Sequence, residues 1–220
     1  MIYDFHTHTF LSDGELLPME LIRRCAANGY TALGIADHAS ASTAERVIKE
    51  GKRDAVLGMR HWGIEVLVGV EITHVPAAGI AEVAELAFSY GAEFTVCHGE
   101  TIVEPVEPGT NHAAILSGKV DILAHPGLIT PEDAKLAAEH GVFLEITCRR
   151  GHCLANGRIV KLGREAGAMF LVNTDGHAPG DLLTEDFAWS VARGAGLTDD
   201  EIKQVLYENP KLLIERVSAR

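Results

Sequence analysis

The stretch YDFHTHTFLSDG, residues 3–14, joins an apolar, strand-like run to two histidines and, five residues further on, an aspartate. Residues two apart in an extended strand point to the same side, so His6 and His8 are expected to face one centre. Because the chain has 11 histidines among 220 residues, the motif has to be weighed against the rest of the sequence.

The same pattern, an apolar run followed by polar side chains, recurs along the chain. The runs are short, mostly continuous and rich in β-branched residues, as expected for strands that are covered on both faces. The seven predicted strands are residues 2–5, 31–36, 65–70, 93–97, 121–124, 142–147 and 168–173. Segments with helical periodicity separate them and often end at glycine, and a last helical segment covers residues 198–217.

Seven successive β–α units predict a parallel α/β fold, which at this number of units fits a closed or nearly closed TIM-like barrel. An open doubly wound sheet is the alternative, since the strand order cannot be read from the sequence. We find no linker and no repeat of fixed period, so a single domain over residues 1–220 is expected. No Gly-x-Gly-x-x-Gly motif follows the first strand, which removes the usual dinucleotide-binding signature.

The composition of the chain restricts the kinds of binding partner that are expected. The formal charge of −12 argues against a surface for non-specific nucleic-acid binding, although bound metal ions can still create a local cationic site. No apolar run has transmembrane length, the N-terminus lacks a signal-peptide layout, and four scattered cysteines do not suggest a disulfide scaffold. We therefore expect a cytoplasmic location and no membrane partner, with the oligomeric state left open.

Catalytic groups of parallel barrels come from the carboxyl ends of the strands, and here six of the seven predicted strands end in a His, Asp or Glu. The nine candidate metal ligands are His6, His8, Asp13, His38, Glu71, His98, His125, Asp175 and His177. Imidazole and carboxylate ligands together suit Zn²⁺, Mn²⁺ or Fe²⁺, and nine are too many for one ion. We expect two to three divalent ions, with a carboxylate such as Glu71 or Asp175 bridging two of them.

Six segments, in this order and spacing, resemble the PHP (polymerase and histidinol phosphatase) family. They are DFHTHTFLSDG (4–14), GIADHA (34–39), GVEIT (69–73), VCHGE (96–100), ILAHPG (122–127) and VNTDGH (172–177). The resemblance extends from residue 1 to about residue 180. It implies a distorted (β/α)7 barrel with up to three divalent metals and phosphoesterase activity, in a stand-alone member without a polymerase segment.

The resemblance also implies how the ligands are shared. One ion would be held by His6, His8, Glu71 and Asp175; a second by Glu71, His98 and His125; and a third by Asp13, His38 and His177. Many members carry a histidine where this chain has Asp13, and an aspartate can also ligate.

The mechanism expected from this set is attack on phosphorus by a hydroxide that bridges two ions. Glu71, Asp175 and His177 would hold the catalytic ions, and Arg149 and Arg150, after the sixth strand, would neutralise phosphoryl oxygens. The proton donor to the leaving group stays open between His112, His152 and a metal-bound water.

Some neighbouring residues are expected to support the site without binding metal. Asp37 and Glu145 are expected to orient ligands or line the barrel, and His74 is expected at the surface. The loop over residues 104–112, which contains two prolines and a glycine, could cover the site.

The leading hypothesis is a phosphatase of small phosphomonoesters, such as histidinol phosphate, a nucleotide or a sugar phosphate. One alternative is a phosphodiesterase or exonuclease that acts on nucleic-acid ends or nucleotides, and another is a non-catalytic metal-binding barrel. Metal-dependent amidohydrolases also place His-x-His after a first barrel strand, but they usually rely on a bridging lysine or another carboxylate in mid-barrel, and no strand here ends in lysine.

Overall fold

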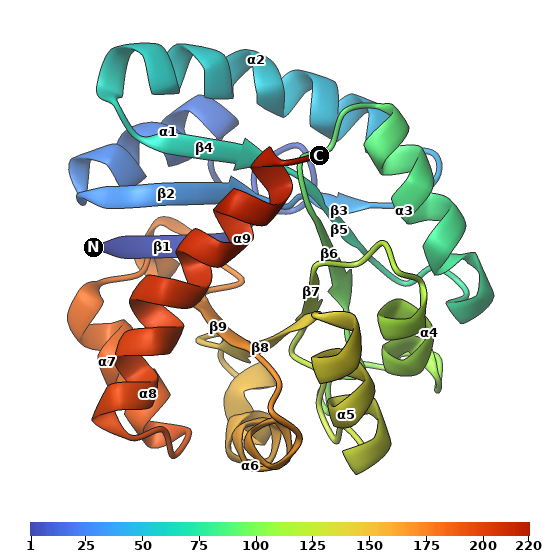
Figure 1. Cartoon of the computed structure of the whole chain (residues 1–220). Coiled ribbons are helices and arrows are strands. Elements are labelled where there is room, and N and C mark those ends of the chain that lie inside the picture. Colours follow the sequence, from blue (N-terminus) through green and yellow to red (C-terminus); the bar gives the residue numbers. More distant parts are fainter.

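The computed structural model describes residues 1–220, and its short strands form the centre of the molecule (Figure 1). The strands are β1 (Ile2–Thr7), β2 (Tyr30–Ile35), β3 (His38–Ala39), β4 (Glu65–Val68), β5 (Val70–Ile72), β6 (Thr95–His98), β7 (Ile122–Ala124), β8 (Phe143–Thr147) and β9 (Phe170–Asn173). Each of the seven predicted runs contains a strand. Two runs continue into a second short strand, because β3 follows β2 and β5 follows β4 after a brief interruption.

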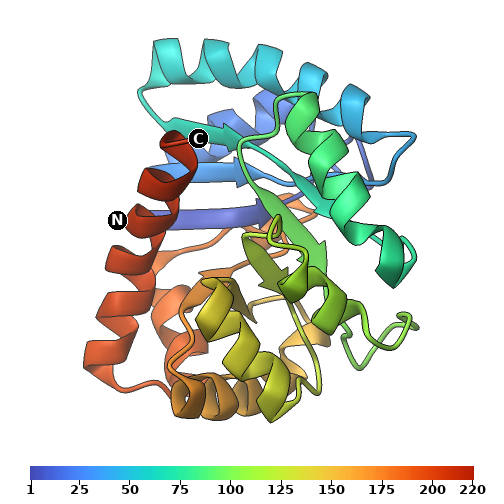
Figure 2. The same cartoon turned by 45° about the vertical axis from the view of Figure 1, so that its right-hand side comes forward.

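Helices surround the strands (Figures 1 and 2). They are α1 (Pro18–Ala27), α2 (Ala44–Trp62), α3 (Ile80–Ser89), α4 (Thr110–Leu116), α5 (Pro131–His140), α6 (Asn156–Ala166), α7 (Glu185–Gly194), α8 (Asp199–Lys203) and α9 (Asn209–Ser218). The last predicted helical segment is divided, since a π-helical stretch over residues 204–208 separates α8 from α9. Pro210 lies in the first turn of α9 and has no N–H to continue a regular α-helical ladder from α8. None of the helices is both long and apolar enough to cross a bilayer.

Every strand pair in the molecule is parallel. One sheet has the order β1-β2-β4 and the other the order β3-β5-β6-β7-β8-β9. The two sheets meet at Gly69, between β4 and β5, where a β-carbon would lie only 2.3 Å from the carbonyl oxygen of Phe94. Only glycine allows this close approach of the two chains.

The first and last strands come together at their carboxyl ends. The amide of His8 donates to the carbonyl of Gly176 (2.9 Å), and the amide of Gly176 donates to the carbonyl of His6 (3.2 Å). β1 and β9 therefore lie side by side without a continuous ladder, and the strands form a ring. The prediction of a parallel, barrel-like α/β fold is confirmed.

The inside of the ring is divided into an apolar and a polar level. The apolar level lies toward the amino ends of the strands. It is filled by the rings of Phe5, Phe94 and Phe143 together with small and aliphatic side chains, and Leu213 of α9 covers it. β1 changes register between Asp4 and Thr7, so that His6, directly after Phe5, also faces the interior, but at the polar level. The apolar level thus forms the floor of the polar one.

The packing of this floor yields a stability prediction. Phe94 is fully buried, and its ring contacts would be lost in Phe94→Ala, so the free energy of unfolding should fall by about 3–5 kcal/mol. Phe10→Ala is the matched control, because Phe10 is 67% exposed and should change stability by about 0.5 kcal/mol or less. Urea denaturation of both variants measures the difference. Equal effects would contradict a packed interior.

Candidate metal centre

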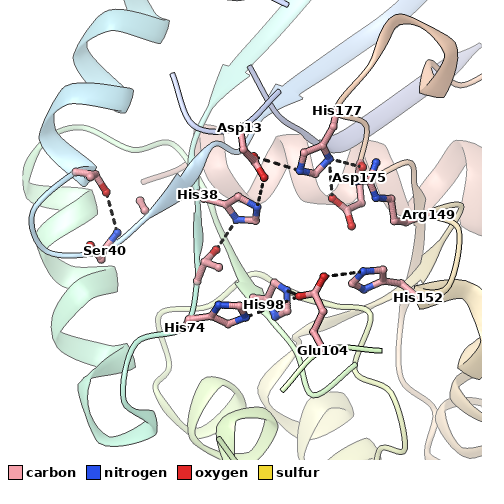
Figure 3. A pocket seen from close by; sticks show the side chains of 13 residues that line it. Asp13, His38, Ser40, His74, His98, Glu104, Arg149, His152, Asp175 and His177 are labelled. Atoms are coloured by element: carbon pink, nitrogen blue, oxygen red, sulfur yellow. Dashed lines mark hydrogen bonds and ion pairs between the residues drawn. The ribbon is translucent and has the colours of Figure 1, made fainter. Parts of the chain in front are cut away.

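A polar pocket of about 540 Å³ opens at the carboxyl ends of the strands (Figure 3). Its lining contains five histidines, three carboxylates and one arginine, and a single apolar residue. The lining residues are Asp13, His38, Ala39, Ser40, Thr43, Thr73, His74, His98, Glu104, Arg149, His152, Asp175 and His177. The sequence segments that contribute them are spread from residue 13 to residue 177, so the site depends on the complete ring of strands.

The innermost group consists of His6, His8, Glu71 and Asp175, whose side chains are almost fully buried. His6 Nε2 lies 3.3 Å from Glu71 Oε1, and His8 Nε2 lies 3.2 Å from Asp175 Oδ1. His6 Nε2, both ring nitrogens of His8, Glu71 Oε1 and Asp175 Oδ1 have no hydrogen-bond partner. Buried polar atoms normally have a hydrogen-bond partner. Imidazole nitrogens and carboxylate oxygens that lack one and lie close together are therefore consistent with a metal site.

Glu145 fixes the orientation of His6. Its Oε2 lies 2.7 Å from His6 Nδ1 and also accepts a hydrogen bond from Asn173 Nδ2 (3.0 Å), and all three side chains are buried. A carboxylate that holds one ring nitrogen leaves the other nitrogen directed at the centre, as in carboxylate–histidine–metal arrangements. The expectation that Glu145 supports a ligand agrees with this contact.

A second group lies nearer to the pocket mouth. Asp13 lies between two histidines, with Oδ2 3.5 Å from His38 Nε2 and Oδ1 3.2 Å from His177 Nε2. Together with His8, these residues place their donor atoms within 4.8 Å of one another. The Asp37 carboxylate makes no hydrogen bond with the His38 ring; it accepts from the amide of Thr9 (2.7 Å) and thereby shapes the loop that carries Asp13.

His125 and His98 take different directions. His125 Nε2 faces the inner carboxylates, 3.6 Å from Glu71 Oε1 and 3.7 Å from Asp175 Oδ2. His98 makes no ion pair with Glu71; its Nε2 lies 3.1 Å from Oε2 of Glu104 instead. Glu104 was not among the candidate ligands, since the sequence shows only that its loop could cover the site.

Two of the site residues have unusual backbone conformations. The φ angles of His125 (27°) and Asp175 (52°) are positive, which is uncommon for residues other than glycine. Next to Asp175, Thr174 donates its amide (3.1 Å) and its hydroxyl (2.5 Å) to the buried carboxylate of Asp4. Such conformations persist where the surroundings enforce them, and they concentrate at functional sites.

At the inner level, carboxylates and histidines stabilise each other's charged forms. Burial alone would raise the pKa of Glu71, but His6 and His38 outweigh it and hold that pKa well below its usual range. Burial likewise works against a charged His6, yet Glu145, Glu71 and Asp175 raise its pKa well above its ordinary value. A metal ion that binds at the inner level would compensate these carboxylates in place of the proton on His6.

Comparison with known proteins matches residues 4–119 to the PHP domain. The chain belongs to the PHP domain family. An uncharacterized protein of Methanocaldococcus jannaschii is 47% identical over 99% of this chain and 100% of its own length. A probable phosphatase of a Thermoanaerobacter species is 27% identical, covering 91% of this chain and 89% of its own.

The fold is also shared with enzymes outside this set of relatives. An amidohydrolase crystal structure superposes with a TM-score of 0.62 at 13% identity, covering 99% of this chain and 74% of that one. At this identity the likeness concerns the fold alone. The residues at the strand ends therefore have to carry any argument about the reaction of this PHP protein.

The two arginines expected to bind phosphate are placed differently. Arg149 lines the pocket, and its Nη1 lies 3.3 Å from Asp181 Oδ2. Arg150 is exposed and does not line the pocket. His74, expected at the surface, is half exposed but also lines the pocket. Its position two residues after β5 is the signal that could have identified it, since the nine candidate ligands occupy similar positions near strand ends.

Protons and metal ions should compete for His38 at the mouth of the PHP pocket, and this competition can be measured. Burial works to lower the pKa of His38, but Glu71 and Asp13 raise it to about 10, whereas burial lowers the pKa of His98 to about 4. In the metal-free protein, His38 should therefore stay protonated up to about pH 10. An ion must displace that proton, so metal affinity at this group should rise by up to about tenfold per pH unit toward pH 10.

NMR of the imidazole nitrogens between pH 6 and 9 measures this difference, with His98 as the neutral control in the same molecule. Addition of Mg²⁺ or Zn²⁺, which are diamagnetic, should convert His38 to the neutral form. A neutral His38 at pH 7 without metal would contradict the prediction.

Proposed function

We propose that this chain is a metal-dependent phosphoesterase and, within that class, a phosphatase of small phosphomonoesters. The observation that carries the proposal is the convergence of unpartnered histidine and carboxylate atoms beneath a pocket that also contains an arginine. We further propose that residues 1–220 act as one PHP-type domain, because strands from both ends of the chain supply the site.

The ligand sets implied by the resemblance are retained in this proposal, except for His98. His6, His8, Glu71 and Asp175 would hold one ion; Glu71 and His125 a second; and Asp13, His38 and His177 a third. The resemblance also assigns His98 to the second ion, but in the structure its Nε2 faces Glu104. Divalent ions of the Zn²⁺, Mn²⁺ or Fe²⁺ class would supply Lewis acidity and a nucleophile at neutral pH. The buried carboxylates and the Glu145–His6 contact hold the ligands in place before substrate arrives, which lowers the cost of ordering them.

Arg149 is the residue proposed to grip the phosphoryl group. A guanidinium binds two oxygens of a phosphate in a planar, bidentate manner, and Asp181 limits its movement. Arg149 follows β8 and lies beside Asp175 and His177 at the pocket (Figure 3). Arg150, which is exposed and outside the pocket lining, is left out of the proposed machinery.

The pocket favours a small substrate. A volume of about 540 Å³ is within the range of sites for small molecules, which fits a nucleotide, a sugar phosphate or a histidinol phosphate-like compound. The net charge of −12 disfavours tight binding of long nucleic acids. The phosphatase name of the Thermoanaerobacter relative supports the same class of reaction.

Phosphate release is the decisive test. The Mn²⁺-loaded protein should release inorganic phosphate from some members of a phosphomonoester panel that includes histidinol phosphate. Asp175→Asn should reduce the rate about 100-fold or more, because it removes a charged ligand atom from the innermost group. Asp186→Asn is the matched control, since Asp186 is exposed on α7 outside the pocket.

Absence of release from every monoester would overturn the phosphatase proposal. Release of nucleotides from the 5′ or 3′ end of an oligonucleotide would instead establish the exonuclease alternative.

Arg149 and Arg150 provide a second, internally matched test. Arg149→Gln should lower kcat/KM about 100-fold by removing a charge-assisted bidentate contact, whereas Arg150→Gln should change it less than twofold. Steady-state kinetics with the best substrate of the panel measures both. Equal losses of kcat/KM in the two variants would show that Arg149 does not contribute to the reaction through its position in the pocket.

A further inference from the structure

Glu104 occupies a position that the nine-ligand scheme does not explain. It belongs to the loop between β6 and α4, and its carboxylate lies among three histidines (Figure 3). Oε2 is 3.1 Å from His98 Nε2 and 3.9 Å from His74 Nε2, and Oε1 is 3.3 Å from His152 Nε2. These histidines come from three separate segments of the chain, so the convergence is a property of the tertiary structure.

The base of the loop is built to hold this position. The carboxylate of Glu100 accepts from the amides of Gly109 (3.0 Å) and Asn111 (2.9 Å), which closes the loop on itself. Asn111 also donates to the carbonyl of Pro126 (2.9 Å), which ties the loop to the segment after β7. Further along, Glu107 accepts from the amide of Ala77 (3.0 Å). Glu104 is therefore presented to the histidines by an anchored loop.

A neutral His98 that donates from Nδ1 directs an acceptor at Glu104. Its Nδ1 lies 3.1 Å from the carbonyl oxygen of Gly99 and can interact with that acceptor only by donating a proton. In the neutral ring, Nε2 then carries a lone pair, and this lone pair faces a carboxylate oxygen. Two acceptors in this arrangement repel each other, and a cation that both coordinate converts the contact into a favourable one.

The donor set has the composition of a zinc site. Two imidazoles and one carboxylate, with donor atoms of His74, His98 and Glu104 all within 4.8 Å of one another, match the His₂Glu type that leaves one position open. His74 reaches the group through a backbone with a φ of 51°, an uncommon conformation for histidine. His152 is 8% exposed in its side chain and lies where it can donate to the second carboxylate oxygen.

We propose that His74, His98 and Glu104 form a binding site for a divalent cation of the Zn²⁺ class at the pocket mouth, with His152 orienting the carboxylate. His98 then ligates an ion together with the loop residue Glu104, while His125 remains with the inner carboxylates. The ion would face the pocket that Arg149 lines, where an anionic substrate enters. A role of this ion in binding substrate rests on the proposed phosphoesterase function, whereas the binding of the ion itself does not.

Co²⁺ titration of the metal-stripped full chain tests the site without any substrate. Visible absorption reports the coordination of each bound ion, and elemental analysis gives the number of ions per chain. Glu104→Gln and His74→Gln should each lose one equivalent of Co²⁺ or bind it at least tenfold more weakly than the unsubstituted protein. Glu132→Gln is the matched control, because Glu132 is exposed on α5 outside the pocket, and it should bind Co²⁺ like the unsubstituted protein.

Circular dichroism establishes that each variant is folded, so that a loss of metal can be assigned to the ligand. Unchanged Co²⁺ stoichiometry and affinity in Glu104→Gln would overturn the proposal. It would also be overturned if Glu104→Gln kept its metal and bound inorganic phosphate more tightly, because Glu104 would then be a competitor of the anion. Absence of phosphatase activity with an intact Co²⁺ response would contradict the proposed function and leave this site standing.

Discussion

The constraint on which the structure depends is the burial of negative charge at the upper level of the barrel. Glu71 and Glu145 are fully buried, and Asp175 is nearly so. Carboxylates removed from water are costly unless a cation or hydrogen-bond donors compensate them. His6, His38 and His125, whose pKa values these carboxylates raise, supply this compensation when protonated, and metal ions would supply it more strongly. Because histidines flank the carboxylates around the ring, the same arrangement serves stability and metal binding.

The rest of the chain holds these groups at fixed positions. The apolar level below them, with Phe5, Phe94 and Phe143, prevents the polar side chains from relaxing downward, and Leu213 of α9 packs against it. At the rim, the contact of Asp4 with Thr174 lies directly before the positive φ angle of Asp175. Backbone strain at the ligand is thus sustained by a buried hydrogen-bonded network.

The parallel arrangement of the strands determines how much of the site could be predicted from the sequence. Parallel strands bring their carboxyl ends to one rim, so a histidine or carboxylate directly after an apolar run, such as His125 or Glu71, can be placed without a structure. The same rule could not separate Arg149 from Arg150, because the turn after β8, and not the strand, decides which of them faces the pocket. Nor could it place Asp37, whose partner Thr9 belongs to a loop 28 residues earlier.

Glu104 shows where prediction from strand ends stops. It lies six residues beyond His98, and its approach depends on the pairing of Glu100 with Asn111, which only the folded loop reveals. Loops after the strands can change without disturbing the apolar floor, since their anchors are other segments that follow strands, such as those at Ala77 and Pro126. The shared barrel therefore fixes where ions can be held, while the loop after β6 and the turn after β8 determine what else reaches them. In this chain they add a carboxylate and a guanidinium, groups of opposite charge on the two sides of one pocket.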